Sequence, residues 1–199
     1  MAVVPLAWSE ANSFGLLHRL LGQSALAVVI GIFVVDLSLY TAHVLMHKVP
    51  TFWRFHRVHH ADTELDSSSG LRQHPLEAVF TTTILVIIPP VLGVSLVSSA
   101  VYTTLALPWF FLNHSNVKYP EWFERGGSLL MSTPNWHRVH HSAYQPETDS
   151  NYGCLFTIWD RVFGTARRVQ VERIQFGLEM FRDASEQTIA ELLKMPFRS

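Results

Sequence analysis

Cysteine and charged residues are both scarce in this chain of 199 residues. Its single cysteine, Cys154, excludes an internal disulfide framework and a cysteine-based zinc cluster. Charged residues make up 16% of the sequence and hydrophobic residues 48%, whereas soluble domains carry about 25% charged residues. The net charge of −1 gives no basic field for nucleic acid. These deficits exclude a disordered chain, argue against an ordinary soluble enzyme and predict no nucleic-acid partner.

Several catalytic signatures are also missing. The chain has no G-x-G-x-x-G loop, no Walker A loop, no G-x-S-x-G serine elbow and no zincin motif. No dinucleotide or flavin site is therefore predicted, and the electrons for any redox reaction have to come from a separate protein. What the chain has instead is histidine: it carries eleven, ten of them between His43 and His141.

Two long apolar stretches predict membrane-spanning helices. Residues 24–46 make a helix of about 34 Å, enough to cross a hydrocarbon core of about 30 Å, and we interpret them as an anchor that stays in the membrane. Residues 78–113 contain no charge but are interrupted by Pro89-Pro90. Proline breaks helices, so we predict a hairpin of two helices, 76–88 and 91–113, that turns at the prolines. Whether it crosses fully or re-enters from one side stays open.

The hairpin returns the chain to the face it left, so ten histidines are predicted to share one membrane face. Lysines and arginines flank them and the hairpin tip has no charge, so the positive-inside rule makes this face cytoplasmic. The expected fold class is an all-α integral membrane helical bundle with a histidine-rich metal site at that face. Residues 1–199 are predicted to form one domain, with a core at about 28–165 and a C-terminal cytoplasmic tail at 166–199.

Eight of these histidines form three clusters: H-x3-H at 43–47, and two identical HRVHH strings at 56–60 and 137–141. Residues three and four apart share a helix face, so each cluster points two or three imidazoles in one direction. Neutral imidazole binds iron, zinc, copper and nickel, and ten rings are enough for two ions with open positions. The predicted metal ligands are His43, His47, His56, His59, His60, His74, His114, His137, His140 and His141.

Three polar residues are predicted to support these ligands without binding the metal. Asp36 is the only charged residue within the first span, where an acid requires a partner. Asn113 and Asn116 flank His114 and can hydrogen-bond a ligand or a water. His74 is assigned either as a ligand or as a further supporting group. No catalytic residue beyond the metal ligands is predicted.

The ordered set of motifs resembles the fatty acid hydroxylase superfamily, also called the sterol desaturase family. The resemblance covers about residues 28–165 and rests on the order H-x3-H, H-x2-HH, hairpin, N-H-x-N and H-x2-HH. Further matching strings are Asp36-x3-Tyr40-x2-His43, RQHPLE at 72–77, NHSN at 113–116, NYG at 151–153 and WDRVFGT at 159–165. The resemblance implies a membrane monooxygenase or desaturase that contains two iron ions and uses O2 as co-substrate; zinc can replace the iron on expression.

The resemblance also implies partners and a location. The partners are a lipid substrate such as a fatty acyl chain or a sterol, the membrane, and a separate electron donor of the cytochrome b5 or ferredoxin type. The chain has no C-terminal retrieval motif, which favours a bacterial inner membrane; in a eukaryote we expect the endoplasmic reticulum. Two alternatives stay open: a non-catalytic membrane metal-binding protein, and a zinc-dependent membrane hydrolase for which Glu77 is the only nearby general base.

Overall fold

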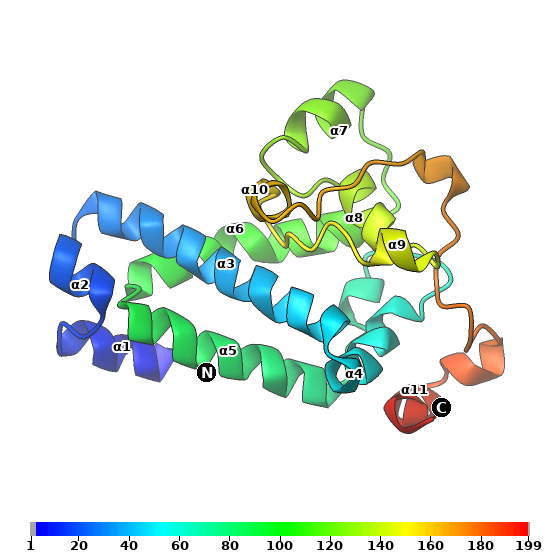
Figure 1. Cartoon of the computed structure of the whole chain (residues 1–199), viewed down its shortest axis with the longest axis horizontal. Helices are drawn as coiled ribbons and strands as arrows, with labels where there is room; N and C mark the ends of the chain where they lie inside the picture. The colour runs from blue at the N-terminus through cyan, green and yellow to red at the C-terminus, as the bar shows by residue number, and fades with distance from the viewer. Residues whose placement is uncertain (1–2, 199) are drawn as a thin grey trace.

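The structure is a computed structural model that describes residues 3–198, and helices dominate it (Figure 1). No extended strand forms among these residues; two isolated bridges join Met131 to Phe156 and Ser142 to Phe176. This confirms the all-α class. In chain order the helices are α1 (Val3–Ala11), α2 (Leu16–Leu21), α3 (Ala25–Lys48), α4 (Pro50–His60), η1 (Ser69–Leu71), α5 (Pro75–Leu92), α6 (Leu96–His114), α7 (Glu121–Gly127), α8 (Pro134–His140), α9 (Gln145–Thr148), α10 (Ile158–Val162), η2 (Val171–Arg173), η3 (Ala184–Gln187), α11 (Ile189–Lys194) and η4 (Met195–Phe197).

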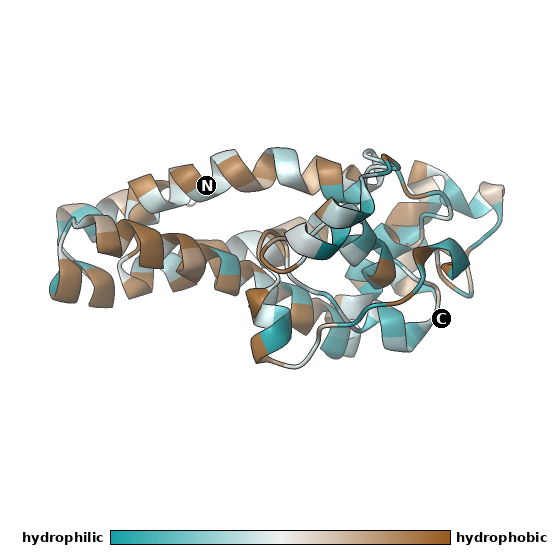
Figure 2. Cartoon of the chain, turned by 90° about the horizontal axis from the view of Figure 1, so that it is seen from above, coloured by the Kyte–Doolittle hydropathy of each residue, from teal (hydrophilic) through white to brown (hydrophobic). Residues whose placement is uncertain are grey.

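Three of these helices, α3, α5 and α6, are long and apolar enough to cross a membrane. The first begins where the sequence predicted, because the Ser24 side chain accepts a hydrogen bond from Ala27 N at 3.2 Å and caps α3. Helix α3 packs against both α5 and α6. Figure 2 shows the apolar residues along these long helices and the polar residues gathered at the other half of the molecule.

The predicted hairpin forms, but its turn lies beyond the two prolines, so that part of the prediction was wrong. Helix α5 includes Pro89 and Pro90 and continues to Leu92. Proline fixes φ near the helical value, so two prolines in a last turn remove hydrogen bonds without reversing the chain. The reversal needs Gly93, which has φ +77°, a left-handed conformation that glycine adopts at little cost. Ser95 then caps α6.

The two ends of this bundle have different contents. The C-terminus of α3, the N-terminus of α5 and the C-terminus of α6 lie at one end, where α4, α8 and α9 gather (Figure 1). The predicted collection of histidines at one end is therefore confirmed, and the cytoplasmic orientation of that end stays a prediction. Helices α1 and α2 cover the opposite end, where Leu6 and Leu17 are buried in the apolar core.

The C-terminal segment packs against α4. The Arg57 guanidinium donates hydrogen bonds to the backbone carbonyls of Met195 and Arg198, the latter at 2.6 Å. Met195 and Phe181 are buried with Val58 in a second, smaller core cluster. Residues from the end of the chain thus cover one face of the helix that carries the first HRVHH string.

Candidate metal centre

Nine of the ten predicted ligands lie in two buried groups that could each hold a metal ion. Within each group, one ring nitrogen per histidine lies within 4.8 Å of those of the other members. The five-histidine group contains His43, His47, His56, His60 and His140, and the four-histidine group contains His59, His114, His137 and His141. All nine side chains are buried. The sequence predicted two sites but not how the histidines divide between them.

The two HRVHH strings each contribute to both groups. On α4, His56 and His60 are one turn apart and join the five-histidine group, while His59 points to the other. On α8 and its C-cap the division is reversed, because His137 and His141 join the four-histidine group and His140 the five-histidine group. Each copy of the motif therefore contributes rings to both groups, and the two copies divide their rings in opposite ways.

Hydrogen bonds donated by Nδ1 fix the tautomer of four histidine rings. His43 donates to Tyr152 O at 2.9 Å, His114 to Phe110 O at 2.7 Å and His140 to Ser150 O at 2.8 Å. Because a carbonyl oxygen only accepts, the proton sits on Nδ1 and leaves Nε2 with a lone pair. His56 Nδ1 likewise contacts Glu77 Oε1 at 2.8 Å. Partners of this kind orient metal-binding imidazoles.

The Nε2 atoms then face one another at short range. His56 Nε2 lies 3.2 Å from Nε2 of both His43 and His60, and His114 Nε2 lies 3.2 Å from His59 and 3.0 Å from His137. Two ligand nitrogens 2.0–2.1 Å from one ion lie about 2.9 Å apart at right angles and about 3.3 Å apart at tetrahedral angles. His43 and His56 both carry their proton on Nδ1, so their Nε2 lone pairs converge and repel unless a cation lies between them. Similar separations surround His114, so the residues fit a metal ion in each group.

Burial keeps the rings in the form that binds metal. Burial, followed by the neighbouring histidines, lowers the pKa of His59, His60, His137 and His141 well below 6.5. Burial lowers the pKa of His140 to about 3. These imidazoles are therefore neutral near pH 7, and a neutral ring is the ligand form of histidine.

Two buried carboxylates hold the predicted ligands in place, a role that the sequence did not predict for either. Glu77 holds His56, as described above. Asp160 accepts from the backbone N–H groups of Tyr152 at 2.8 Å and Gly153 at 3.0 Å, and so secures the loop whose carbonyls bind His43 and His140. The sequence signals were the place of Glu77 in the RQHPLE string, at the edge of an apolar stretch, and the place of Asp160 in the WDRVFGT string.

The other predicted site residues lie outside the two groups. The Asp36 carboxylate accepts from Tyr102 Oη at 2.6 Å and Trp159 Nε1 at 2.8 Å, joining α3 to α6 and α10. Asn113 Nδ2 donates to Cys154 O at 3.2 Å, and Asn116 is exposed. His74 Nδ1 accepts from Leu76 N at 3.2 Å, so its ring caps α5.

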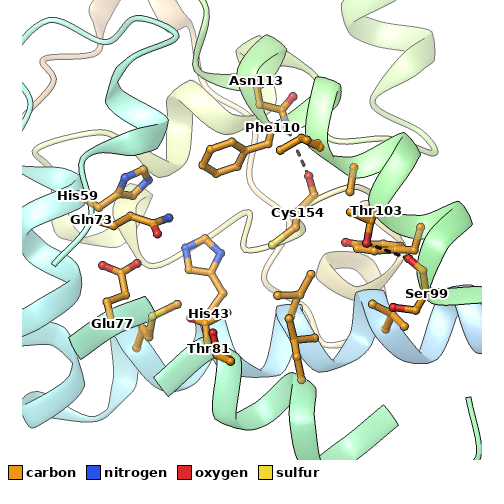
Figure 3. Close-up of a pocket in the computed structure, with 18 of the residues that line it drawn as sticks. His43, His59, Gln73, Glu77, Thr81, Ser99, Thr103, Phe110, Asn113 and Cys154 are labelled. Atoms are coloured by element: carbon orange, nitrogen blue, oxygen red, sulfur yellow. Dashed lines mark hydrogen bonds between the residues drawn. The ribbon is translucent and has the colours of Figure 1, made fainter. Parts of the chain in front are cut away.

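A largely apolar chamber of about 550 Å³ begins at both histidine groups and runs between α3, α5 and α6. His43 of the five-histidine group and His59 of the four-histidine group border it at one end, together with Gln73 and Glu77 (Figure 3). Leu6 and Pro89 line its far end. The arrangement places two groups that could each hold a metal ion beside a space suited to a hydrocarbon chain.

Comparisons with known proteins agree with this geometry. The family model described as fatty acid hydroxylase matches residues 28–165. Human alkylglycerol monooxygenase is 31% identical over 150 residues, which cover 72% of this chain and 31% of that protein. The ornithine lipid hydroxylase OlsE of Rhizobium tropici is 35% identical over 147 residues, covering 71% and 42%. A Delta(7)-sterol 5(6)-desaturase of Candida glabrata is 24% identical over 160 residues, covering 80% and 41%.

The chain thus spans less than half the length of these curated relatives. No solved structure matches it significantly.

Proposed function

The chain belongs to the fatty acid hydroxylase family, and on that premise we propose that it is an O2-dependent membrane oxygenase that hydroxylates or desaturates an aliphatic carbon of a lipid. The observation that carries the proposal is the convergence of two buried imidazole groups at one end of an apolar chamber. An aliphatic C–H bond is unreactive, and a pair of irons with O2 supplies the oxidant that its cleavage requires.

The proposed ligands are the nine histidines of the two groups, with one iron in each. The protein's part is to orient these rings, which the carbonyls of Tyr152, Phe110 and Ser150 do through Nδ1. Their burial would keep bulk water away from an iron held there. We assign His74 to capping α5 and Asp36 to joining the spans, because of the hydrogen bonds these two residues make.

Partners and location belong to the same proposal. The chain has no nucleotide- or flavin-binding motif, so we propose that a separate cytochrome b5-like or ferredoxin-like protein delivers the electrons. The histidine end is proposed to face the cytoplasm, in a bacterial inner membrane or, in a eukaryote, in the endoplasmic reticulum. The lipid is proposed to enter from the bilayer while the donor approaches from the aqueous side.

The test removes one ligand from each group and compares metal content with O2 consumption. His59→Ala and His140→Ala are each expected to lower iron from two per chain toward one and to abolish lipid-dependent O2 consumption. His18→Ala on α2, at the opposite end of the bundle, is the matched control and is expected to retain both.

Full metal content and turnover in both ligand variants would overturn the assignment. Two tightly bound metals in the wild type without any O2 consumption would favour the non-catalytic metal-binding alternative. Turnover of a lipid ester without O2 would favour the hydrolase.

A further inference from the structure

We infer that the chamber binds one hydrocarbon chain of an amphiphile tail-first, with a hydrogen-bond-donating polar end at Glu77 and Gln73. A carbon close to the polar end then lies beside the histidine groups, and the length of the chamber limits the length of the tail. The inference rests on the proposed function and deepens it, because it names the class of substrate and the position oxidised.

The dimensions of the chamber suit a single chain. Glu77 and Pro89, both on α5, line its two ends, and twelve residues of helix span about 18 Å. The volume is about 550 Å³. At about 30 Å³ for each water-sized group, this is room for on the order of 18 heavy atoms. A tail of that size fills the space between the histidine groups and the far end.

The far end is closed by a segment that lies outside the residues matched by the family. Leu6 of α1 lines the chamber and is 2% exposed, whereas the family match begins at residue 28. Helix α1 is held there, because Ser9 Oγ donates to Pro90 O at 2.9 Å and Gly15 lies directly against Gly93. This chain therefore sets its own limit on tail length.

One side of the chamber has an incomplete wall, between two of the helices proposed to cross the membrane. Helices α5 and α6 share the turn at Gly93 and diverge from it toward the histidine end (Figure 1). Leu107 on α6 both lines the chamber and is 57% exposed, so the wall is incomplete on this side. A tail can enter sideways from the bilayer between α5 and α6.

The polar end of the ligand is placed by an unsatisfied acceptor. Glu77 is buried; its Oε1 contacts His56, and its Oε2 has no hydrogen-bond partner. A buried oxygen without a donor is destabilising, and a donor on the ligand removes that penalty. Figure 3 shows Gln73 beside Glu77 at the histidine end, with Thr103 at the other end. The Thr103 hydroxyl already donates to Ser99 O at 2.8 Å.

The first experiment measures binding without turnover. Metal-loaded protein is titrated, in the absence of O2, with saturated monoacylglycerols of increasing chain length. Ala106→Trp fills the chamber from α6 and is expected to weaken binding of the longest chains at least tenfold while sparing short ones. Leu6→Ala extends the chamber and is expected to move the limit to longer chains. The matched control is Leu105→Trp, because Leu105 is 51% exposed on the same helix and does not line the chamber.

The polar end is tested with Glu77→Gln, which retains an oxygen for His56 but puts an amide N–H₂ where the free oxygen was. We expect monoacylglycerol binding to fall to the level of the fatty acid methyl ester of the same length, which has no donor. Equal loss for both probes would overturn the role of Glu77 in binding the polar end.

The position of oxidation is read from products of the wild type by fragment-ion mass spectrometry. The product carbon is expected at a constant distance from the polar end across chain lengths. A constant distance from the methyl end, or a chain-length limit that Ala106→Trp and Leu6→Ala leave unmoved, would overturn the inference. The chain-length limit for binding can move as expected while neither the wild type nor any variant consumes O2. In that case the proposed function fails, and the inference that the chamber binds a tail stands.

Discussion

Replacing Asp160 tests how the protein holds its five-histidine group. Its carboxylate accepts four hydrogen bonds: from Tyr152 N at 2.8 Å, Gly153 N at 3.0 Å, Trp136 Nε1 at 3.3 Å and Thr165 Oγ1 at 2.7 Å. Asp160→Ala leaves these buried donors without an acceptor. A buried donor left without an acceptor costs about 1–3 kcal/mol, and several are left here, so we expect the melting temperature to fall by on the order of 10 °C.

The metal content is expected to change at one group before the other. The loop that Asp160 secures supplies Ser150 O and Tyr152 O, the acceptors for two rings of the five-histidine group. In the four-histidine group, His114 is held by Phe110 O on its own helix. Loss of such supporting contacts weakens metal binding about 10–100-fold. Asp160→Ala is therefore expected to retain about one metal per chain after dialysis against a weak chelator.

Double variants identify the group that is lost. Asp160→Ala with His59→Ala is expected to retain no metal, whereas Asp160→Ala with His140→Ala retains the metal of the four-histidine group. Burial raises the pKa of Asp160 despite its hydrogen bonds, so the neutral Asp160→Asn is expected to be milder. Two metals and an unchanged melting temperature in Asp160→Ala would refute the reasoning, as would loss from the four-histidine group first.

Three further predictions concern stability. Gly15→Ala is expected to cost about 2–5 kcal/mol, because Gly15 has φ +99° and an added Cβ would lie 2.3 Å from Gly93 N; Gly126→Ala, in open space, is the control in thermal denaturation. Trp159→Phe removes the donor to one Asp36 oxygen and is expected to lower the free energy of unfolding by about 1–3 kcal/mol, whereas the same change at exposed Trp122 leaves it unchanged. Metal-free protein is expected to lose stability as the pH falls below 6.5. In the unfolded chain His140 takes up a proton in that range, whereas in the folded protein its pKa is about 3 and it stays neutral. Denaturation midpoints that are equal above and below pH 6.5 would contradict this.

Hydropathy and local chemistry predicted the spans well. The apolar run gave the start of α3 within one residue, since hydropathy is a local signal, and the structure adds the Ser24 cap. The hairpin turn was misplaced because two prolines were taken as the break. The deciding feature was the left-handed conformation at Gly93, against which Gly15 packs from the segment between α1 and α2.

The division of the histidines could not be predicted in the same way. Identical HRVHH strings have identical local preferences, so only the relative placement of α4 and α8 decides which group each ring joins. His74 has the same side chain as the grouped histidines, but its position before Pro75 makes it a helix cap. The role of Glu77 depends on its contact with His56, more than twenty positions away in the sequence. The role of Asp160 depends on the loop at Tyr152, which folds around its carboxylate.

The division of the histidines between the two groups has a consequence for the order in which the groups form during synthesis of the chain. Four of the five rings in the five-histidine group come from residues 43–60, a short stretch that is complete once α3 and α4 have been made. The four-histidine group draws on residues 59–141, so it waits for the hairpin to insert and for α8 to emerge. Contacts close in sequence form first because they close smaller loops. The nascent chain can therefore bring four rings of the five-histidine group together early, whereas both groups are complete only when α8 docks and adds His140 to one and His137 and His141 to the other.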